Sequence, residues 1–255
     1  MGRKLANRKY QKNIQDMEVL LNNNIMAQVE GPKRKKWSLH DLQPIQPMTD
    51  RQHDMFEAFY SGTHVCAYGS AGVGKTYLAL YLAMKDVLDK MRDQKRLIIV
   101  RTTVQGRQQG YLPGTQEEKE APFELPYKDI MHDLFGRAST YDDMKEAHLI
   151  EFKSTTALRG LTWDDAIIVV DEFQNMTWEE LDSVVTRVGT NSRLIICGDV
   201  RHQCDLGRHE VSGAQNALKV MQDMPSFSCV QFTKDDIVRS DFVKQWITTR
   251  EKLGL

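Results

Sequence analysis

Residues 69–76 carry the pattern G-x-x-x-x-G-K-T within the stretch AYGSAGVGKTYLAL. The glycines let the backbone bend so that its N–H groups point inward, Lys75 supplies a cation for the β- and γ-phosphates, and Thr76 supplies a hydroxyl for magnesium. A strand-like apolar run precedes the motif and a helical pattern follows it, as a phosphate-binding loop requires. We therefore expect a nucleotide to bind at Gly69, Ser70, Ala71, Gly72, Val73, Gly74, Lys75 and Thr76.

A second group of chemical residues, DEFQN, follows the apolar run AIIVV. Asp171 stands at the end of this predicted strand, where a carboxylate can hold magnesium. Glu172 follows directly and is placed to take a proton from an attacking water molecule. The two carboxylates favour ATP hydrolysis over phosphate transfer to a bound small molecule. A GTPase switch is disfavoured because it requires Gly at position 174, which is Gln. The stretch TKDD at 233–236 resembles a guanine-reading motif, but we interpret Lys234 and Asp235 as solvent-facing charges that begin a helix.

The elements that must position these residues alternate between strands and helices. Strands are predicted at 64–69, 96–102, 148–154, 165–173, 192–199 and 228–234, helices at 50–62, 75–90, 177–189, 212–223 and 240–252, and an irregular stretch at 102–122. Strands separated by helices indicate a parallel sheet covered on both faces. The predicted fold class is therefore α/β, of the P-loop NTPase type.

Charge is distributed unevenly along the chain, although the net charge is only −1. Residues 1–36 contain nine Lys and Arg against three acidic residues, so this segment carries +6 and the remainder −7. We predict a basic arm and linker at 1–48, with a polar helix at 10–28, followed by a folded domain at 49–255. The arm is either a solvated, partly disordered extension or a segment that meets a phosphate backbone.

The composition fits an ordinary globular protein, with 41% hydrophobic and 27% charged residues. Four cysteines form no C-x-x-C pair, which favours reduced thiols over disulfides or zinc. The longest apolar run, near 78–84, is too short to span a bilayer, and the N-terminus has no apolar signal core. We therefore expect a cytoplasmic location and no membrane partner.

The motif DEFQN also resembles motif II of superfamily 1 helicases. Together with GYLPG at 110–114, LRGLTWDDAIIVVDEFQN at 158–175, TRVGTNSRLIICGD at 186–199 and DDIVRSDFV at 235–243, it resembles the PhoH-like family. This resemblance covers residues 49–250 and implies a RecA-like ATPase core related to those helicases, ATP and Mg²⁺ as cofactors, and a role in RNA metabolism or phosphate starvation. A short, stand-alone chain resembles phage-encoded members, which would act in the host cytoplasm.

The resemblance implies roles for single residues as well. The phosphate loop and the two carboxylates match the family's nucleotide and magnesium site, and Gln174 matches the motif II glutamine that couples the γ-phosphate to a neighbouring element. Gln52 sits where relatives place a glutamine that reads adenine. Relatives read G-D-x-x-Q before Asp-Leu, whereas GDVRHQCDL is one residue longer. Gln203 or His202 is therefore expected at the γ-phosphate, and we favour Gln203 because an amide does not titrate near pH 7.

A superfamily 1 helicase binds ATP between two RecA-like domains, but the predicted domain has room for only one. The arginine that stabilises the transferred phosphoryl group would then come from the next copy in a homo-oligomeric ring, about six subunits by analogy with ring ATPases. Arg239 is the first candidate for this arginine finger. Arg187 and Arg159 are the alternatives.

Nucleic acid would follow loops at the strand ends. The stretch RTTVQGRQQGYLPGT offers Arg101, Arg107 and Tyr111 to single-stranded RNA or DNA, and Trp37 is a second aromatic candidate. The first functional hypothesis is an ATP-driven helicase or remodelling motor for single-stranded nucleic acid, with RNA as the expected substrate. The alternative is an ATP-dependent assembly switch or scaffold without unwinding activity. A small-molecule kinase would need an Arg-rich lid and a nuclease a separate acidic cluster, and the sequence shows neither.

Overall fold

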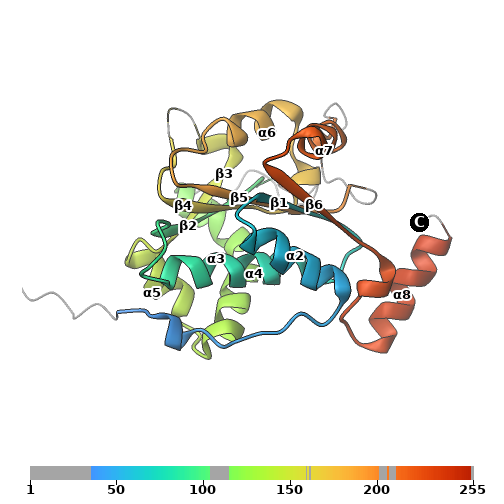
Figure 1. The fold of residues 1–255 in the computed structure, drawn as a ribbon, viewed down its shortest axis with the longest axis horizontal. Coiled ribbons are helices and arrows are strands. Elements are labelled where there is room, and N and C mark those ends of the chain that lie inside the picture. The colour runs from blue at the N-terminus through green and yellow to red at the C-terminus, as the bar shows by residue number, and fades with distance from the viewer. Residues whose placement is uncertain are drawn as a thin grey trace, which may run out of the picture. The chain divides into compact units, whose positions relative to one another are not determined.

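One six-stranded sheet lies at the centre of the fold (Figure 1). The computed structural model describes residues 36–103, 115–158, 160, 162–200, 206 and 211–253. The strands are β1 (His64–Gly69), β2 (Arg96–Arg101), β3 (Ile150–Ser154), β4 (Ala166–Val170), β5 (Arg193–Gly198) and β6 (Phe227–Phe232), in the order β3-β2-β4-β5-β1-β6. Every neighbouring pair is parallel. The carboxyl ends of the strands therefore lie at one edge of the sheet, where α/β proteins bind their ligands.

Alternating side chains along the strands build two layers of core. In β4, Ile167 and Val169 belong to one layer while Ile168 and Val170 belong to the other, because successive strand residues point to opposite faces. All five β4 side chains are fully buried. Burial on both faces explains why this strand is an unbroken apolar run in the sequence.

Helices cover both faces of the sheet. Four of them, α2 (Asp50–Tyr60), α3 (Lys75–Leu88), α4 (Gln116–Phe135) and α5 (Thr140–Glu146), pack on one face, and α6 (Trp178–Val185) and α7 (Ala214–Asp223) pack on the other (Figure 1). The last helix, α8 (Asp241–Lys252), joins the first layer through Ile247. Short 3-10 helices span Leu39–Asp41, Thr155–Ala157, Phe173–Asn175 and Lys234–Asp236. The predicted α/β fold, a RecA-like parallel sheet with helices on both faces, is confirmed.

Helix α4 differs from the irregular stretch that we predicted up to residue 122. Its first turn is fixed by a capping box, in which Thr115 and Glu118 bond each other's backbone N–H groups. Two prolines lie inside the helix, and each removes a backbone hydrogen bond. The helix nevertheless buries Tyr127, Met131 and Leu134 completely. This spacing of three to four residues anchors the helix to the core, so burial outweighs the local cost of the prolines.

The segment before α2 packs against the same core. Trp37 meets the ring of Phe135 edge-on at 5.5 Å between centroids, and the N–H of Gln43 donates a 2.9 Å hydrogen bond to the carbonyl oxygen of Leu134. A compact unit therefore begins at Trp37 and runs to Leu255. The nucleic-acid stacking predicted for Trp37 stays a prediction. Most of the predicted basic arm, including its helix at 10–28, lies outside the described residues.

The described cysteines are free thiols, in agreement with the sequence. Cys66 and Cys197 are buried and Cys229 is half-buried. Burial raises the pKa of the Cys197 thiol well above its usual value, which keeps it protonated and unreactive. Among the helices that the structure describes, none is long and apolar enough to cross a lipid bilayer.

Candidate nucleotide-binding site

The predicted phosphate loop connects β1 to α3 at the carboxyl edge of the sheet. Gly69, Gly72 and Gly74 have φ angles of 120°, 76° and 86°, in a region that residues with a side chain rarely adopt. A Cβ atom at Gly69 would lie 2.0 Å from the carbonyl oxygen of Phe232 on the adjacent β6. Glycine is therefore required at position 69 by its conformation and by the close approach of β6.

Lys75 folds back over the loop that precedes it. Its Nζ atom donates hydrogen bonds to the carbonyl oxygens of Gly69 at 2.9 Å and Ser70 at 2.8 Å. Burial lowers the pKa of Lys75, while the nearby carboxylate of Asp199 acts in the opposite direction. The ammonium group thus lies at the mouth of the loop, where a phosphate would meet it.

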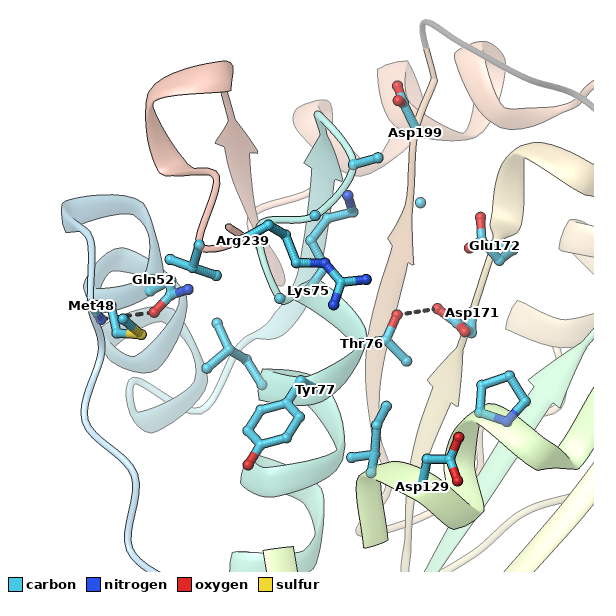
Figure 2. A pocket seen from close by; sticks show the side chains of 18 of the residues that line it. Met48, Gln52, Lys75, Thr76, Tyr77, Asp129, Asp171, Glu172, Asp199 and Arg239 are labelled. Carbon is cyan, nitrogen blue, oxygen red and sulfur yellow. Dashed lines mark hydrogen bonds between the residues drawn. The ribbon is translucent and has the colours of Figure 1, made fainter. Parts of the chain in front are cut away.

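Thr76 and Asp171 are 95 residues apart in the chain and in contact in the fold. Thr76 Oγ1 donates a 2.8 Å hydrogen bond to Asp171 Oδ1 (Figure 2). Asp171 follows β4 and is only 4% exposed. A carboxylate beside a hydroxyl provides the oxygen ligands that Mg²⁺ accepts together with water and phosphate oxygens. The residues present therefore fit a magnesium ion that binds with a nucleotide.

The second oxygen of Asp171 also has a donor within the chain. The hydroxyl of Tyr127, on α4, donates a 2.9 Å hydrogen bond to Asp171 Oδ2. Burial, reinforced by the charge of Asp171, raises the pKa of Tyr127 well above its usual value, so the hydroxyl keeps its proton. Arg101 interacts electrostatically with Tyr127, Asp171 and Glu172. The nucleic-acid contact predicted for Arg101 stays a prediction.

Glu172 adopts an unusual backbone conformation directly after Asp171. Its φ angle is 55°, which costs a residue other than glycine about 1–3 kcal/mol and is found most often at functional sites. Burial raises the pKa of the Glu172 carboxyl, and the charge of Asp171 raises it further. A half-buried carboxylate at this position can accept a proton from a water molecule.

Gln174 joins Glu172 to the end of β5. Its amide nitrogen donates to Glu172 Oε2, and its amide oxygen accepts a 2.9 Å hydrogen bond from the N–H of Asp199. A Cβ atom at Gly198 would lie 2.3 Å from the same amide oxygen, so glycine at 198 makes room for this bridge. The predicted coupling residue thus connects the ends of β4 and β5.

Gln52 lies beside the loop on α2 and is 3% exposed. Its Oε1 atom accepts a 2.8 Å hydrogen bond from the N–H of Met48, and its Nε2 atom donates a 2.9 Å hydrogen bond to the carbonyl oxygen of Val73. The amide therefore ties the segment before α2 to the phosphate loop. The adenine contact of Gln52 stays a prediction.

One pocket has a volume of 810 Å³, within the range of about 300–1,000 Å³ that small-molecule sites occupy. Its lining includes Gln52, Gly72, Gly74, Lys75, Thr76, Asp171, Glu172, Gln174, Gly198 and Asp199. Figure 2 shows Lys75, Asp171 and Glu172 on the side of the strand ends, with Met48 on the opposite side. The wall near Met48 also includes Ile45 and Tyr77. The pocket is thus charged at one end and more apolar at the other, as a nucleotide requires.

Two arginines of the same chain also line the pocket. The Cγ atom of Arg239 would lie 3.2 Å from a Cβ atom on Gly72, and the side chain points into the pocket (Figure 2). Arg250 lines the pocket from α8. Arg239 lies over the phosphate loop of its own chain, because β6 runs beside β1 and leads the chain back to that loop. The action of Arg239 on a neighbouring copy stays a prediction.

The remaining predicted residues lie away from the phosphate loop or outside the described residues. Arg187 follows α6, and its carbonyl oxygen accepts a 2.8 Å hydrogen bond from Trp163, near the amino end of β4. It is therefore at the edge of the sheet opposite to the phosphate loop. Outside the described residues lie Arg107, Tyr111, Arg159, His202 and Gln203.

Three residues of the site had no role in our sequence predictions. Tyr127 stands in the stretch ELPYKD, whose prolines concealed the helix that carries it. Arg250 lies on a helix that we predicted, but the pattern did not show what the helix packs against. Asp199 was recognisable as a polar residue at the end of an apolar strand, which is the signal that identified Asp171.

The chain is similar to known proteins over most of its length. The chain is 32% identical over 209 residues to a PhoH-like protein of Synechocystis sp., covering 82% of this chain and 62% of the relative. It is 34% identical over 209 residues to a PhoH-like protein of Bacillus subtilis, covering 82% of this chain and 64% of the relative. The chain thus spans less than two thirds of the length of these relatives.

Among solved structures, the fold is similar to the Pif1 helicase from Candida albicans, with a TM-score of 0.37 and 15% sequence identity, over 74% of this chain and 41% of that one. These relatives do not bear on the phage-type origin, which stays a prediction. The family model described as "PhoH-like protein" matches residues 44–251. The chain, a P-loop NTPase by fold and motif, therefore belongs to the PhoH-like family.

Proposed function

We propose that the chain hydrolyses ATP with Mg²⁺ and acts as a homo-oligomeric ring. The ring binds nucleic acid as a single strand, with RNA as the preferred substrate, and uses the energy of hydrolysis to remodel or unwind it. The observation that carries the hydrolytic part is the meeting of Lys75, Thr76, Asp171 and Glu172 in one pocket. Each supplies a different requirement of the reaction: a cation for phosphate, two ligands for the metal, and a base for water.

The residues divide the reaction between them. Thr76 and Asp171 would hold Mg²⁺, which, when bound, neutralises charge on the β- and γ-phosphates. Lys75 leaves the loop carbonyls to contact the same phosphates. Glu172 orients the attacking water and accepts its proton, while Gln174 holds the Glu172 carboxylate in place. The neutral amide keeps this alignment without competing for the proton.

Positive charge for the transition state has a source within the pocket itself. Arg239 and Arg250 both line it, and an arginine at the transferred phosphoryl group is worth about 10³–10⁵ in rate. A ring is still part of the proposal. In that ring Arg187 and Arg159 are the arginines left to act on a neighbouring copy.

Steady-state ATPase rates, measured at low salt with and without single-stranded RNA and DNA, test the proposal. The expected result is Mg²⁺-dependent hydrolysis that RNA accelerates, and its loss in Lys75→Ala. Particle mass with a non-hydrolysable ATP analogue tests the ring. If nucleic acid leaves the ATPase rate unchanged and the particle mass depends on nucleotide, the results would instead support the assembly switch. A chain that binds no nucleotide would refute both functions.

A further inference from the structure

Both oxygens of the Asp171 carboxylate are held by hydroxyl groups from other elements. Thr76, on α3, donates to Oδ1 at 2.8 Å, and Tyr127, on α4, donates to Oδ2 at 2.9 Å. Tyr127 is fully buried and lies 44 residues before Asp171. The carboxylate therefore cannot rotate without breaking a contact with a helix of the core.

Arg101, at the end of β2, interacts electrostatically with both Tyr127 and Asp171. A guanidinium has donors and no acceptor, so Arg101 cannot compete with Asp171 for the single hydroxyl proton of Tyr127. The hydroxyl on α4 is therefore left to donate to the carboxylate at the end of β4.

The position of the Tyr127 hydroxyl is set by packing at a distance from the nucleotide. The ring lies 6.0 Å from that of Phe152 on β3, centroid to centroid, and Met131 and Leu134 anchor the following turns of α4. Helix α4 also lines the nucleotide pocket with Pro126 and Ile130. Its buried residue Tyr127 holds the predicted metal ligand Asp171 by a hydrogen bond.

We propose that Tyr127, backed by Arg101, is a positioning residue that fixes the Asp171 carboxylate for Mg²⁺. The inference rests on the proposed function, because it concerns the metal that accompanies the nucleotide. Partners that orient a metal ligand typically change metal affinity by about 10- to 100-fold when they are removed. A tyrosine that only filled the core would leave metal affinity unchanged.

Tyr127→Phe separates these roles, since it removes the hydroxyl and keeps the ring. We would titrate Mg²⁺ into the protein with a fluorescent ATP analogue and record the Mg²⁺ concentration that gives half of the gain in nucleotide affinity. The variant is expected to need about 10- to 100-fold more Mg²⁺, with its nucleotide affinity in EDTA unchanged. Arg101→Met should shift the midpoint in the same direction.

The matched control is Tyr141→Phe. Tyr141 is equally buried, but the carboxyl group beside its hydroxyl is that of Glu124 and not that of Asp171, so the Mg²⁺ midpoint should stay at the wild-type value. A wild-type midpoint in both Tyr127→Phe and Arg101→Met would overturn the inference and leave the proposed function intact. If Mg²⁺ does not change the nucleotide affinity of the wild-type protein, the proposed function is overturned as well.

Discussion

Gln174 and Glu172 are hydrogen-bonded to each other through their side chains, and the same amide of Gln174 accepts a hydrogen bond from the end of β5. The Glu172 carboxylate is therefore fixed relative to two strands, although it lies on a turn. Such fixation suits a general base, because the base must meet the water molecule in a defined orientation.

Glu172→Gln should retain ATP binding and lose hydrolysis. The amide has the shape of the carboxylate but cannot accept a proton, so kcat is expected to fall by about 10²–10⁴. Single-turnover hydrolysis and binding of a fluorescent ATP analogue measure the two effects separately. Lys75→Ala is the comparison, since it should lose binding itself. An equal loss of binding in both variants would contradict the role of Glu172.

Gln174→Glu should reduce the rate more than the affinity for nucleotide. The substitution replaces the donor to Glu172 with a carboxylate oxygen and places like charges in contact. The expected pattern is a lower kcat with little change in nucleotide affinity, measured by steady-state kinetics and equilibrium binding. Gln215→Glu, an exposed residue on α7, makes the same chemical change away from the site and should alter neither quantity.

Arg239 gives the sharpest test of cooperation between copies. Because it lies over the loop of its own chain, mixing Arg239→Ala protein with Glu172→Gln protein should recover no ATPase activity. Each subunit would retain a defect in its own pocket. Partial recovery at a series of mixing ratios would show instead that Arg239 acts on the neighbouring copy, as we predicted from the sequence.

Two glycines allow the cost of conformation to be separated from the cost of close approach. Gly62 has a φ angle of 90° and free space around the position of a Cβ atom, whereas Gly69 combines a φ angle of 120° with the close contact to Phe232. Gly62→Ala should lower the free energy of unfolding by about 1–2 kcal/mol. Gly69→Ala should lower it further and abolish nucleotide binding. Urea unfolding of both variants measures the difference, and equal losses would show that the approach of β6 has no energetic effect.

His64 should make the stability of the fold depend on pH. Its Nδ1 atom accepts a 3.0 Å hydrogen bond from the N–H of Leu194, which requires the neutral ring. Burial lowers the pKa of His64 from 6.5, and the charge of Arg193 lowers it further. The unfolded chain therefore binds this proton more readily, so the stability present above pH 6.5 is lost as the pH falls toward the lower folded-state pKa.

His64→Asn provides the control for this pH dependence. Its side-chain oxygen can accept the bond from Leu194 but does not titrate. Thermal unfolding between pH 5 and 8 should show a steeper fall of Tm at acid pH in the wild type than in His64→Asn. Parallel Tm curves would exclude His64 as the cause.

The sequence predicted most of the fold because its strongest signals are local. The buried strand β4 is an unbroken apolar run, and Thr177 with Glu180 forms the capping box that was predicted for α6. Helix α4 was missed because the prolines at 122 and 126 are unfavourable in a helix, and their cost is offset only by contacts with distant parts of the chain. Local patterns do not record such contacts.

The same distinction applies to the site. The loop and the two carboxylates are short motifs whose chemistry is contained in neighbouring residues. Tyr127 could not be found in this way, since it meets Asp171 across 44 positions. The position of Arg239 over its own phosphate loop could not be predicted for a related reason, because it depends on β6 pairing with β1 and no single segment of the sequence gives the strand order.

The two carbonyl oxygens that hold Lys75 have a consequence for turnover. The ammonium group has hydrogen-bond acceptors at Gly69 and Ser70 within its own loop. These carbonyl oxygens can replace a departing product phosphate as partners of Lys75, so the lysine keeps two hydrogen bonds after the exchange. The loop thereby competes with the product for the lysine and favours product release.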